Sequence, residues 1–267
     1  MISLNLSIIV VTYNCENYIE KFLNELKNSL LYFSDFQILI NDNSSSDNTY
    51  LLCVKHSDSN ISVFKSDNIG FAKANNLLIK RAQYDNILLL NPDVFGFNRN
   101  TWISLFDKWD KINPCFIRLL NEDLSIQVNV GDELSLKRYL IKFLRGYSSP
   151  SYSEKIISVQ SGIMAFVLLT KDSLNVVGLI SEKYYMYSED HDWFIRAGKK
   201  GFKPQFIPCI KLIHIGGASA KSRWKKKEEN SIKLKSERML INEHFRGFER
   251  FVLLVINNIK KLINRFK

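Results

Sequence analysis

Few of the features that mark disulfide-bonded, zinc-binding or membrane-spanning proteins are present in this sequence. Among its 267 residues there are only four cysteines, Cys15, Cys53, Cys115 and Cys209, and no two of them form a C-x-x-C pair. Isolated cysteines favour neither a disulfide framework nor a zinc site, and they are typical of a reducing compartment. No stretch reaches the roughly 18 uninterrupted apolar residues of a membrane-spanning helix, so we expect a soluble or peripheral protein.

Several motifs that would indicate other functions are also missing. The first residues, MISLNLSIIVVTYN, lack the basic segment of a signal peptide and resemble a buried strand. No G-x-G-x-x-G follows Val11, which argues against a dinucleotide-binding enzyme. Internal repeats and low-complexity linkers are absent as well. We therefore expect a cytoplasmic protein with one large domain and a short appendage.

Positive charge is concentrated at one end of the chain. The net charge is +10 from 37 basic and 27 acidic residues. Residues 221–267 hold 14 basic and 5 acidic residues, a net +9, which leaves +1 for the first 220 residues. Enzymes acting on nucleic acids more often spread basic side chains around a groove. We therefore place an anionic partner at the C-terminal tail and predict no nucleic-acid partner.

Buried strands alternate with amphipathic helices in the first hundred residues. Continuous apolar runs predict strands, and apolar residues at helical spacing predict helices. This alternation predicts a mostly parallel α/β sheet flanked by helices. The predicted strands are Ser7–Val11, Gln37–Ile40, Ile61–Lys65, Ile87–Leu90, Val159–Leu169 and Phe206–Ile215, and the predicted helices are Asn17–Leu31, Leu51–Lys55 (capped by Asp47), Phe71–Ala82, Leu134–Leu144 and 189–201.

Polar groups stand directly after three of these strands. They are Thr12-Tyr13-Asn14, Asp42-Asn43 and Asn91-Pro92-Asp93. Ligands of open α/β sheets bind beyond the carboxyl ends of the strands, so we expect these groups to meet at one crevice. Asparagine, aspartate and serine also gather in ordinary turns for backbone reasons, and the composition by itself leaves that alternative open.

Five segments, in this order, resemble family 2 glycosyltransferases of the GT-A (Rossmann-like) fold. They are IVVTYN with LINDNSSSDNT, then NIGFAKANN, NPD, SEDHDWFIR and HIGGAS, and together they span Ile8 to Ser219. The resemblance implies a GT-A domain over residues 1–220, with the nucleotide-sugar half at about 1–95 and the acceptor half at about 96–220. It implies a nucleotide-sugar site made of Thr12, Tyr13, Asn14, Asp42, Asn43, Asn68, Gly70, Asn75 and Asn91.

The same resemblance implies a divalent cation, Mg²⁺ or Mn²⁺, at the place of the family's D-x-D motif. Here the segment reads Asn91-Pro92-Asp93, with a single carboxylate. Asp93 would be the metal ligand, and His214 at the end of the last strand would complete its shell. Carboxylate oxygens and shared substrate phosphates are what such cations prefer. Asp after Pro in a strand-end turn, and a hydrogen-bonded strand-end histidine, are the structural alternatives.

The acidic segment near residue 190 resembles the family's acceptor motif. Transfer to a hydroxyl requires removal of its proton, and a nearby carboxylate can accept it. A nucleoside diphosphate leaves readily when a metal stabilises it, so one base suffices, and Asp190 is the expected base. The expected acceptor-binding residues are Glu189, Asp192, Arg196 and Gly162. An acidic first turn also suits the helix dipole without catalysis, whereas His56, His191 and His244 carry no functional signal.

The tail, residues 221–267, is predicted to contain a basic amphipathic helix. Apolar residues recur at spacings of three and four, at Phe248, Val252, Val255, Ile259, Leu262 and Phe266. Such a helix suits an anionic membrane surface, which would place the protein on the inner face of the cell membrane. The alternatives are a helix packed on the domain or in a homodimer.

The resemblance implies an inverting transferase that uses a UDP- or dTDP-linked sugar. Resemblance to surface-polysaccharide enzymes favours rhamnose as the sugar and a lipid-linked O-antigen or capsule glycan as the acceptor. One alternative is a sugar-phosphate nucleotidyltransferase, which would normally carry a Gly-rich basic loop after the first strand, where this chain has TYNCEN. The other is a non-catalytic glycan-binding or scaffold protein of a membrane assembly.

Overall fold

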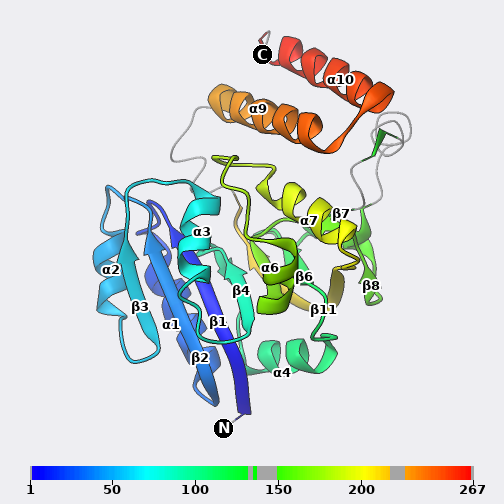
Figure 1. Cartoon of the computed structure of the whole chain (residues 1–267). Coiled ribbons are helices and arrows are strands. Elements are labelled where there is room, and N and C mark those ends of the chain that lie inside the picture. Colours follow the sequence, from blue (N-terminus) through cyan, green and yellow to red (C-terminus); the bar gives the residue numbers. More distant parts are fainter. Residues whose placement is uncertain (1, 132–134, 137–148, 217–225, 266–267) are drawn as a thin grey trace.

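A mixed sheet of nine strands forms the centre of the molecule (Figure 1). The computed structural model describes residues 2–131, 135–136, 149–216 and 226–265. The strand order is β3-β2-β1-β4-β10-β6-β11-β5, with β8 paired to β11. The bounds are β1 Ile2–Thr12, β2 Phe33–Asp42, β3 Ile61–Lys65, β4 Asn86–Leu90, β5 Val94–Phe95, β6 Cys115–Leu120, β8 Ile157–Ser158, β10 Phe166–Thr170 and β11 Gln205–His214.

Four of the eight strand pairs in this sheet are parallel, and six of its nine strands share one direction. Strand β1 runs parallel to β2 and β4, β2 to β3, and β11 to β6. Strand β10 is antiparallel to both of its neighbours, β4 and β6. The mostly parallel α/β sheet expected from the sequence is confirmed, and the carboxyl ends of β1, β2 and β4 meet at one edge.

Helices cover both faces of the sheet because its strands alternate their apolar side chains between two cores. Ile8 and Val10 pack in one core with Phe22 of α1, whereas Ile9 packs in the other core with Trp193 of α7. The first core also takes residues of α2 and α4, and the second takes residues of α3 and α6. The bounds are α1 Ile19–Leu30, α2 Thr49–Lys55, α3 Phe71–Ile79, α4 Arg99–Lys108, α6 Lys171–Val177 and α7 Glu189–Lys199.

The expected strand Val159–Leu169 is wrong as a single element. The chain forms β9 (Ser161–Gly162), leaves extended structure, and then forms β10. Strand β9 pairs with β7 (Val130–Gly131) in a separate two-stranded sheet. A Cβ on Gly162 would lie 2.6 Å from the Phe116 ring, so the glycine permits this close packing.

Other expectations agree with the structure or fall outside it. The expected strand Ile61–Lys65 is confirmed residue for residue, and Asp47 accepts a hydrogen bond from Thr49 N at the start of α2. The sequence did not predict β6, nor α4 and α6. Most of the expected helix Leu134–Leu144, and residues 217–225 after the last strand, lie outside the described residues.

Two helices form a C-terminal hairpin at the end of the molecule opposite the N-terminus (Figure 1). They are α9 (Lys226–His244) and α10 (Gly247–Arg265). Helix α9 faces α7, and α10 lies outermost. Ile241, Phe245 and Leu253 form a small buried cluster between them. No helix in the part of the chain that the structure describes combines the length and apolar composition needed to cross a bilayer.

Candidate active site

The ends of β1 and β2 form a tightly bonded corner. Thr12 and Asp42 are register partners on the two parallel strands, and Thr12 Oγ1 donates to Asp42 Oδ1 at 3.2 Å. Asp42 is fully buried and also accepts from the backbone N and the Oγ of Ser45. Its carboxylate therefore organises the loop after β2, which leaves other groups of this corner to meet a ligand directly.

Asn14 joins the two loops of this corner. It has a left-handed backbone, with φ of 47°. Its backbone N donates to Ser45 Oγ at 2.9 Å, and its side-chain oxygen accepts from Ser46 N at 2.9 Å. Tyr13, beside it, is half-buried. The structure thus brings the predicted residues Thr12, Asn14 and Asp42 together.

The Asn68–Gly70 segment connects this corner to the second half of the domain. Asn43 donates through Nδ2 to Asn68 Oδ1 at 3.2 Å and accepts from Ile69 N at 3.0 Å. Tyr185 OH also donates to Asn68 Oδ1, at 3.1 Å. Gly70 has φ of 84°, and a Cβ there would lie 2.8 Å from the Tyr185 carbonyl oxygen. Only glycine permits this contact between the two halves.

Two asparagines on α3 are engaged within the protein. Asn75 Nδ2 donates to Phe71 O in its own helix at 2.9 Å. Asn76, the last residue of the NIGFAKANN segment, donates to Ile180 O and Glu182 and accepts from Ile180 N. The bonds of Asn76 attach α3 to the segment that leads to α7, whereas the bond of Asn75 stays within α3.

Asp93 and His214, the two predicted metal ligands, lie side by side. Strand β5 pairs with β11 so that Val94 faces His214, and Ile215 N donates to Asp93 O at 3.1 Å. Asp93 Oδ1 is 3.3 Å from His214 Nε2, and both side chains are buried. The two residues are 121 positions apart in the sequence, and the sheet topology is what joins them.

Gln127 fixes the orientation of the His214 ring. Its Nε2 donates to Asn121 Oδ1 and to His214 O, so its Oε1 is the atom that accepts from His214 Nδ1, at 2.7 Å. A neutral imidazole with its proton on Nδ1 presents Nε2 as an acceptor. Nε2 is buried and makes no hydrogen bond with any residue the structure describes. His214 Nε2 and Asp93 Oδ1 are close enough for an ion pair but are not aligned for a hydrogen bond.

The lone pair of His214 Nε2 faces a carboxylate oxygen of Asp93, and two such ligand atoms suit a cation. Without a proton or a metal between them, the two lone pairs repel, and the buried His214 Nε2 lacks a hydrogen-bond partner among the described residues. A histidine held by a hydrogen bond at its second nitrogen is the usual arrangement of a metal ligand. Asn91 forms the turn before this pair, with its N bonded to Ala165 O and its O to Val94 N. The residues present therefore fit a divalent cation.

Helix α7 begins with the acidic residues that the sequence singled out. Glu189 is buried, and burial, together with the neighbouring charge of Asp190, raises the pKa of Glu189 to about 8. Its Oε2 has no hydrogen-bond partner among the described residues. Asp190 is more accessible and accepts from His191 N at 2.7 Å. Burial thus favours the protonated form of Glu189, and Asp190 is the more accessible carboxyl of the two.

Asp192 and Arg196 tie α7 to its surroundings. Asp192 is 1% exposed and accepts from Arg196 Nε at 2.9 Å and from His244 Nε2 at 2.8 Å. Arg196 also donates to Val177 O and Leu179 O. Gly162, expected to contact the acceptor, packs against Phe116. These three residues support the site from behind.

Sequence reasoning missed four residues that shape the site: Gln127, Tyr185, Glu243 and His244. Their partners, His214, Asn68 and Asp192, are 52 to 117 positions away along the chain. Glu243 lies beside His244 and pairs with Lys183 at 2.6 Å. A lone glutamine or histidine carries no local pattern, so only the fold reveals these contacts.

Comparison with curated proteins finds similarity to sugar transferases along most of the chain. Rhamnosyltransferase WbbL of Escherichia coli (strain K12) is 23% identical over 261 residues, which cover 89% of this chain and 96% of that protein. The N-acetylglucosaminyl-diphospho-decaprenol L-rhamnosyltransferase of Mycobacterium tuberculosis is 25% identical over 236 residues, covering 78% of this chain and 75% of that protein.

Solved structures of glycosyltransferases share the fold. The mannosyltransferase PcManGT from Pyrobaculum calidifontis, solved with GDP-Man and Mn²⁺, has a TM-score of 0.62 at 12% identity and covers 98% of this chain and 71% of its own. The TarS 1–349 fragment of S. aureus, solved with UDP-GlcNAc, has a TM-score of 0.58 at 18% identity, with coverages of 89% and 66%. These likenesses confirm the expected GT-A architecture.

The family itself is shown by a direct match to its sequence model. The model described as glycosyl transferase family 2 matches residues 7–144, more than half of the chain. The matched region contains the Thr12–Asp42 corner, the Asn68–Gly70 segment and Asp93. The chain belongs to glycosyl transferase family 2.

Proposed function

We propose that this glycosyltransferase moves a sugar from a UDP- or dTDP-linked donor to a lipid-linked or surface glycan, and that the sugar is rhamnose. The observation that carries the proposal is the buried Asp93–His214 pair at the edge of the sheet, 3.3 Å apart. The acidic start of α7 supplies the second requirement, a base for the acceptor hydroxyl. The rhamnose assignment draws on the two rhamnosyltransferases to which the chain is similar.

Asp93 and His214 would hold a divalent cation, Mg²⁺ or Mn²⁺. Gln127 keeps the acceptor face of His214 directed at Asp93, and the burial of both side chains strengthens their attraction for a positive charge. When bound, such a cation supplies stabilisation for the diphosphate that leaves. Two protein ligands leave the remaining positions to phosphate oxygens and water, as is common for Mg²⁺.

Thr12, Tyr13, Asn14 and Asn43 would surround the nucleoside, with Asn68, Gly70 and Asn91 nearer the sugar. The corner they form is held by hydrogen bonds within the protein, so little ordering is needed when the donor binds. Preorganisation of this kind lowers the entropic cost of binding. Asp42, Asn75 and the helix α3 would act through the shape of the corner rather than by direct contact.

Asp190 would accept the proton of the attacking hydroxyl. Asp190 is the more accessible member of the pair, and burial favours the protonated form of Glu189 by raising its pKa. The protonated Glu189, whose Oε2 has no partner among the described residues, would donate to the acceptor and orient it. Attack by that hydroxyl from the face opposite the diphosphate inverts the anomeric carbon in one displacement.

Assays of donor turnover test this proposal. The wild-type chain, supplied with Mn²⁺ and dTDP-rhamnose, UDP-GlcNAc or GDP-mannose in turn, is expected to release nucleoside diphosphate from one of them. Release should be faster with a lipid-linked glycan acceptor and should stop with a chelator. Asp190→Asn should keep donor binding and lose about 10²–10⁴-fold of the transfer rate, the usual contribution of a general base. No release from any donor contradicts the proposal, and an active Asp190→Asn contradicts the base.

The C-terminal helix α10 would bring the enzyme to the inner face of the cell membrane. Its apolar residues Phe248, Phe251, Val255, Ile259, Leu262 and Ile263 are exposed rather than packed. The side of α10 that meets α9 combines buried Leu253 with polar contacts: Asn257 bonds to Leu234 O and Glu237, and Lys260 pairs with Glu237 at 2.7 Å. This packing leaves the exposed apolar side of α10 for another partner.

We assign that partner to an anionic lipid surface. Arg246, Arg250 and Lys261 are exposed on or next to the same helix. Residues 221–267 carry a net +9, a charge that a second copy of the same segment would repel and that anionic headgroups would neutralise. An acceptor carried by a membrane lipid would meet the site from the same side, because α9 lies between α10 and α7 (Figure 1).

A further inference from the structure

The turn that leads into α7 has an unfavourable backbone conformation. Tyr187 and Ser188 are both in the left-handed region, with φ of 67° and 70°. Ser188 is the N-cap residue, yet its side chain makes no capping hydrogen bond. Non-glycine residues in this region cost free energy and persist only where the surroundings hold them. The next two residues are Glu189 and Asp190, so whatever holds this turn also places the acidic pair.

Helix α9 bonds to the turn from outside the sheet domain. Ser236 Oγ donates to Met186 O at 2.8 Å, and Tyr187 OH donates to Glu229 Oε1 at 2.9 Å. Lys183, just before the turn, pairs with Glu243 at 2.6 Å. These contacts come from residues more than 40 positions further along the chain, beyond the end of the matched family region at residue 144.

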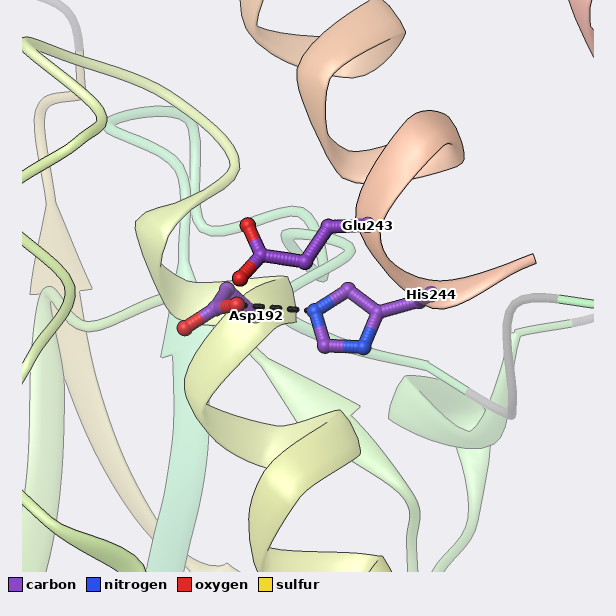
Figure 2. A group of neighbouring side chains, drawn as sticks. All are labelled: Asp192, Glu243 and His244. Carbon is purple, nitrogen blue, oxygen red and sulfur yellow. Dashed lines mark hydrogen bonds and ion pairs between the residues drawn. The ribbon is translucent and has the colours of Figure 1, made fainter.

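The deepest of these contacts joins His244 to Asp192 (Figure 2). Asp192 N donates to Ser188 O at 2.9 Å, which closes the first turn of α7. One carboxylate oxygen of Asp192 accepts from His244 Nε2 at 2.8 Å, and the other accepts from Arg196 Nε at 2.9 Å. The Nδ1 atom of His244 lies 3.5 Å from Lys199 Nζ. His244 thus reaches the first turn of α7 from the last residue of α9.

We propose that His244 is a positioning residue for sugar transfer, acting through Asp192 on the turn that carries Glu189 and Asp190. The inference rests on the proposed function of that acidic pair. Without His244, a buried carboxylate oxygen of Asp192 loses its donor, and such a loss is costly enough to shift the side chain. Displacement of a catalytic group by about 1 Å can cost on the order of 100-fold in rate.

The same three side chains, Asp192, Glu243 and His244, offer metal-ligating atoms within 4.8 Å of one another. The two carboxylates already have hydrogen-bond donors. Arg196 and His244 donate to Asp192, and Lys183 and Tyr184 donate to Glu243. Matched in this way, they hold α9 to α7 without an ion. Figure 2 shows His244 and Glu243 extending from α9 toward Asp192 on α7.

Replacement of His244 by two amides of different length tests the proposal. A glutamine places its Nε2 amide where the His244 Nε2 donor stands, whereas an asparagine reaches only as far as Nδ1. We expect His244→Asn and His244→Ala to lower kcat about 100-fold with the donor KM unchanged, and His244→Gln to retain kcat within about threefold. Arg238→Ala is the matched control, since Arg238 bonds to Asn258 on α10 and not to α7.

Hydrogen exchange in the absence of any donor gives a second readout. The amide of Asp192 should exchange faster in His244→Asn than in the wild type, His244→Gln or Arg238→Ala. If His244→Asn keeps its kcat, or if His244→Gln is as slow as His244→Asn, His244 is not a positioning residue. If the wild type itself transfers no sugar while the exchange pattern follows the prediction, the proposed function fails and the contact between α9 and α7 stands.

Discussion

Two buried side-chain atoms with a proposed role, His214 Nε2 and Glu189 Oε2, have no hydrogen-bond partner among the described residues. His191 Nδ1 on α7 is a third such atom, and it has no proposed role. An unmatched buried polar atom costs roughly 1–3 kcal/mol, and native proteins keep few of them. A ligand that supplies the missing partner would recover that cost: a cation for His214, and an acceptor hydroxyl for Glu189.

Replacement of Asp93 should separate metal binding from folding. Asp93→Asn keeps the shape of the side chain but removes the charge, so we expect binding of nucleoside diphosphate with Mn²⁺ to weaken at least tenfold, about 1.4 kcal/mol, with little change in thermal unfolding. His214→Ala should show the same defect in weaker form. Calorimetric titration measures it, and Asp107→Asn, an exposed carboxylate on α4, is the control. Unchanged affinity in Asp93→Asn would remove the metal assignment.

The raised pKa of Glu189 makes a prediction about stability and pH. In the unfolded chain its carboxyl ionises above about 4.5, whereas in the folded protein it keeps its proton up to about 8. The unfolded state therefore binds fewer protons between these values, and the Glu189 contribution to stability falls as pH rises through this window. Glu189→Gln, which cannot ionise, should be more stable than wild type at pH 8, by on the order of 2–4 kcal/mol, and nearly equal at pH 4.5.

Thermal unfolding of both proteins at pH 4.5, 6.5 and 8 measures this difference. Glu122→Gln, a replacement of an exposed carboxyl, controls for the loss of one acidic group at the surface. A difference that is constant across the three pH values would mean that Glu189 is ionised in the folded protein over the whole range.

At the scale of helices and strands, the sequence predicted what depends on local pattern. The runs in β1, β2 and β4 are continuous because both faces of these strands are covered, and periodicity alone identifies them. Strand β6 was missed because Arg118 interrupts its apolar run; the structure buries that arginine against Glu154 and Ser153. The break between β9 and β10 was missed because it depends on Phe116, which contacts Gly162 only in the folded chain.

In the candidate site, too, local motifs predicted some residues and could not predict others. Asp93, His214, Glu189 and Asp190 were predicted from motifs, and the structure confirms that the first two are adjacent. Gln127 and His244 could not be predicted, because each acts on a partner about 50 to 90 positions away. Helical spacing found the apolar side of α10, but it could not tell whether that side packs on the protein or faces outward.

Substitution of the apolar stripe of α10 should release the protein from lipid without changing its fold. Phe251→Ser with Ile259→Ser removes two exposed apolar side chains, so their loss should cost little folding stability and lower the affinity for anionic vesicles about 10- to 100-fold. Vesicle sedimentation at low and high salt measures it, and salt should weaken the wild-type interaction by screening its basic side chains. Ile112→Ser, an exposed apolar residue elsewhere, is the control.

Sedimentation of the protein without vesicles tests the alternative partner, a second copy of the chain. If the stripe joins two copies of the chain, the wild type should be a dimer in solution, the double variant a monomer, and neither should bind vesicles. That outcome would replace the membrane assignment with a homodimer.

On the scale of the whole molecule, the C-terminal segment 221–267 carries most of the net charge, and its hairpin also bonds to the chain on either side of the acidic pair. Residues 221–267 hold +9 of the +10, and Glu229, Ser236, Glu243 and His244 bond to the segment 183–192. The sequence separated residues 1–220 from this tail by composition. The contacts support a different proposal, in which α9 belongs functionally to the transferase domain and α10 is the part directed at the membrane.

Truncation should therefore not reproduce the effect of the stripe substitutions. Removal of the chain from Phe245 onward takes away the buried side chains of Phe245 and Leu253, which pack with Ile241 of α9. We expect α9 to lose its support, the contact between His244 and Asp192 to open, and transfer to a soluble acceptor analogue to fall together with vesicle binding. The Phe251→Ser/Ile259→Ser protein should lose vesicle binding alone, because its substitutions lie on the exposed side of α10. Transfer to the soluble analogue and vesicle binding are measured in parallel for the two proteins. A truncated chain that stays fully active would mean that α9 holds its place without α10. A double variant that loses transfer to the soluble analogue would mean that the exposed stripe contributes to the folded site.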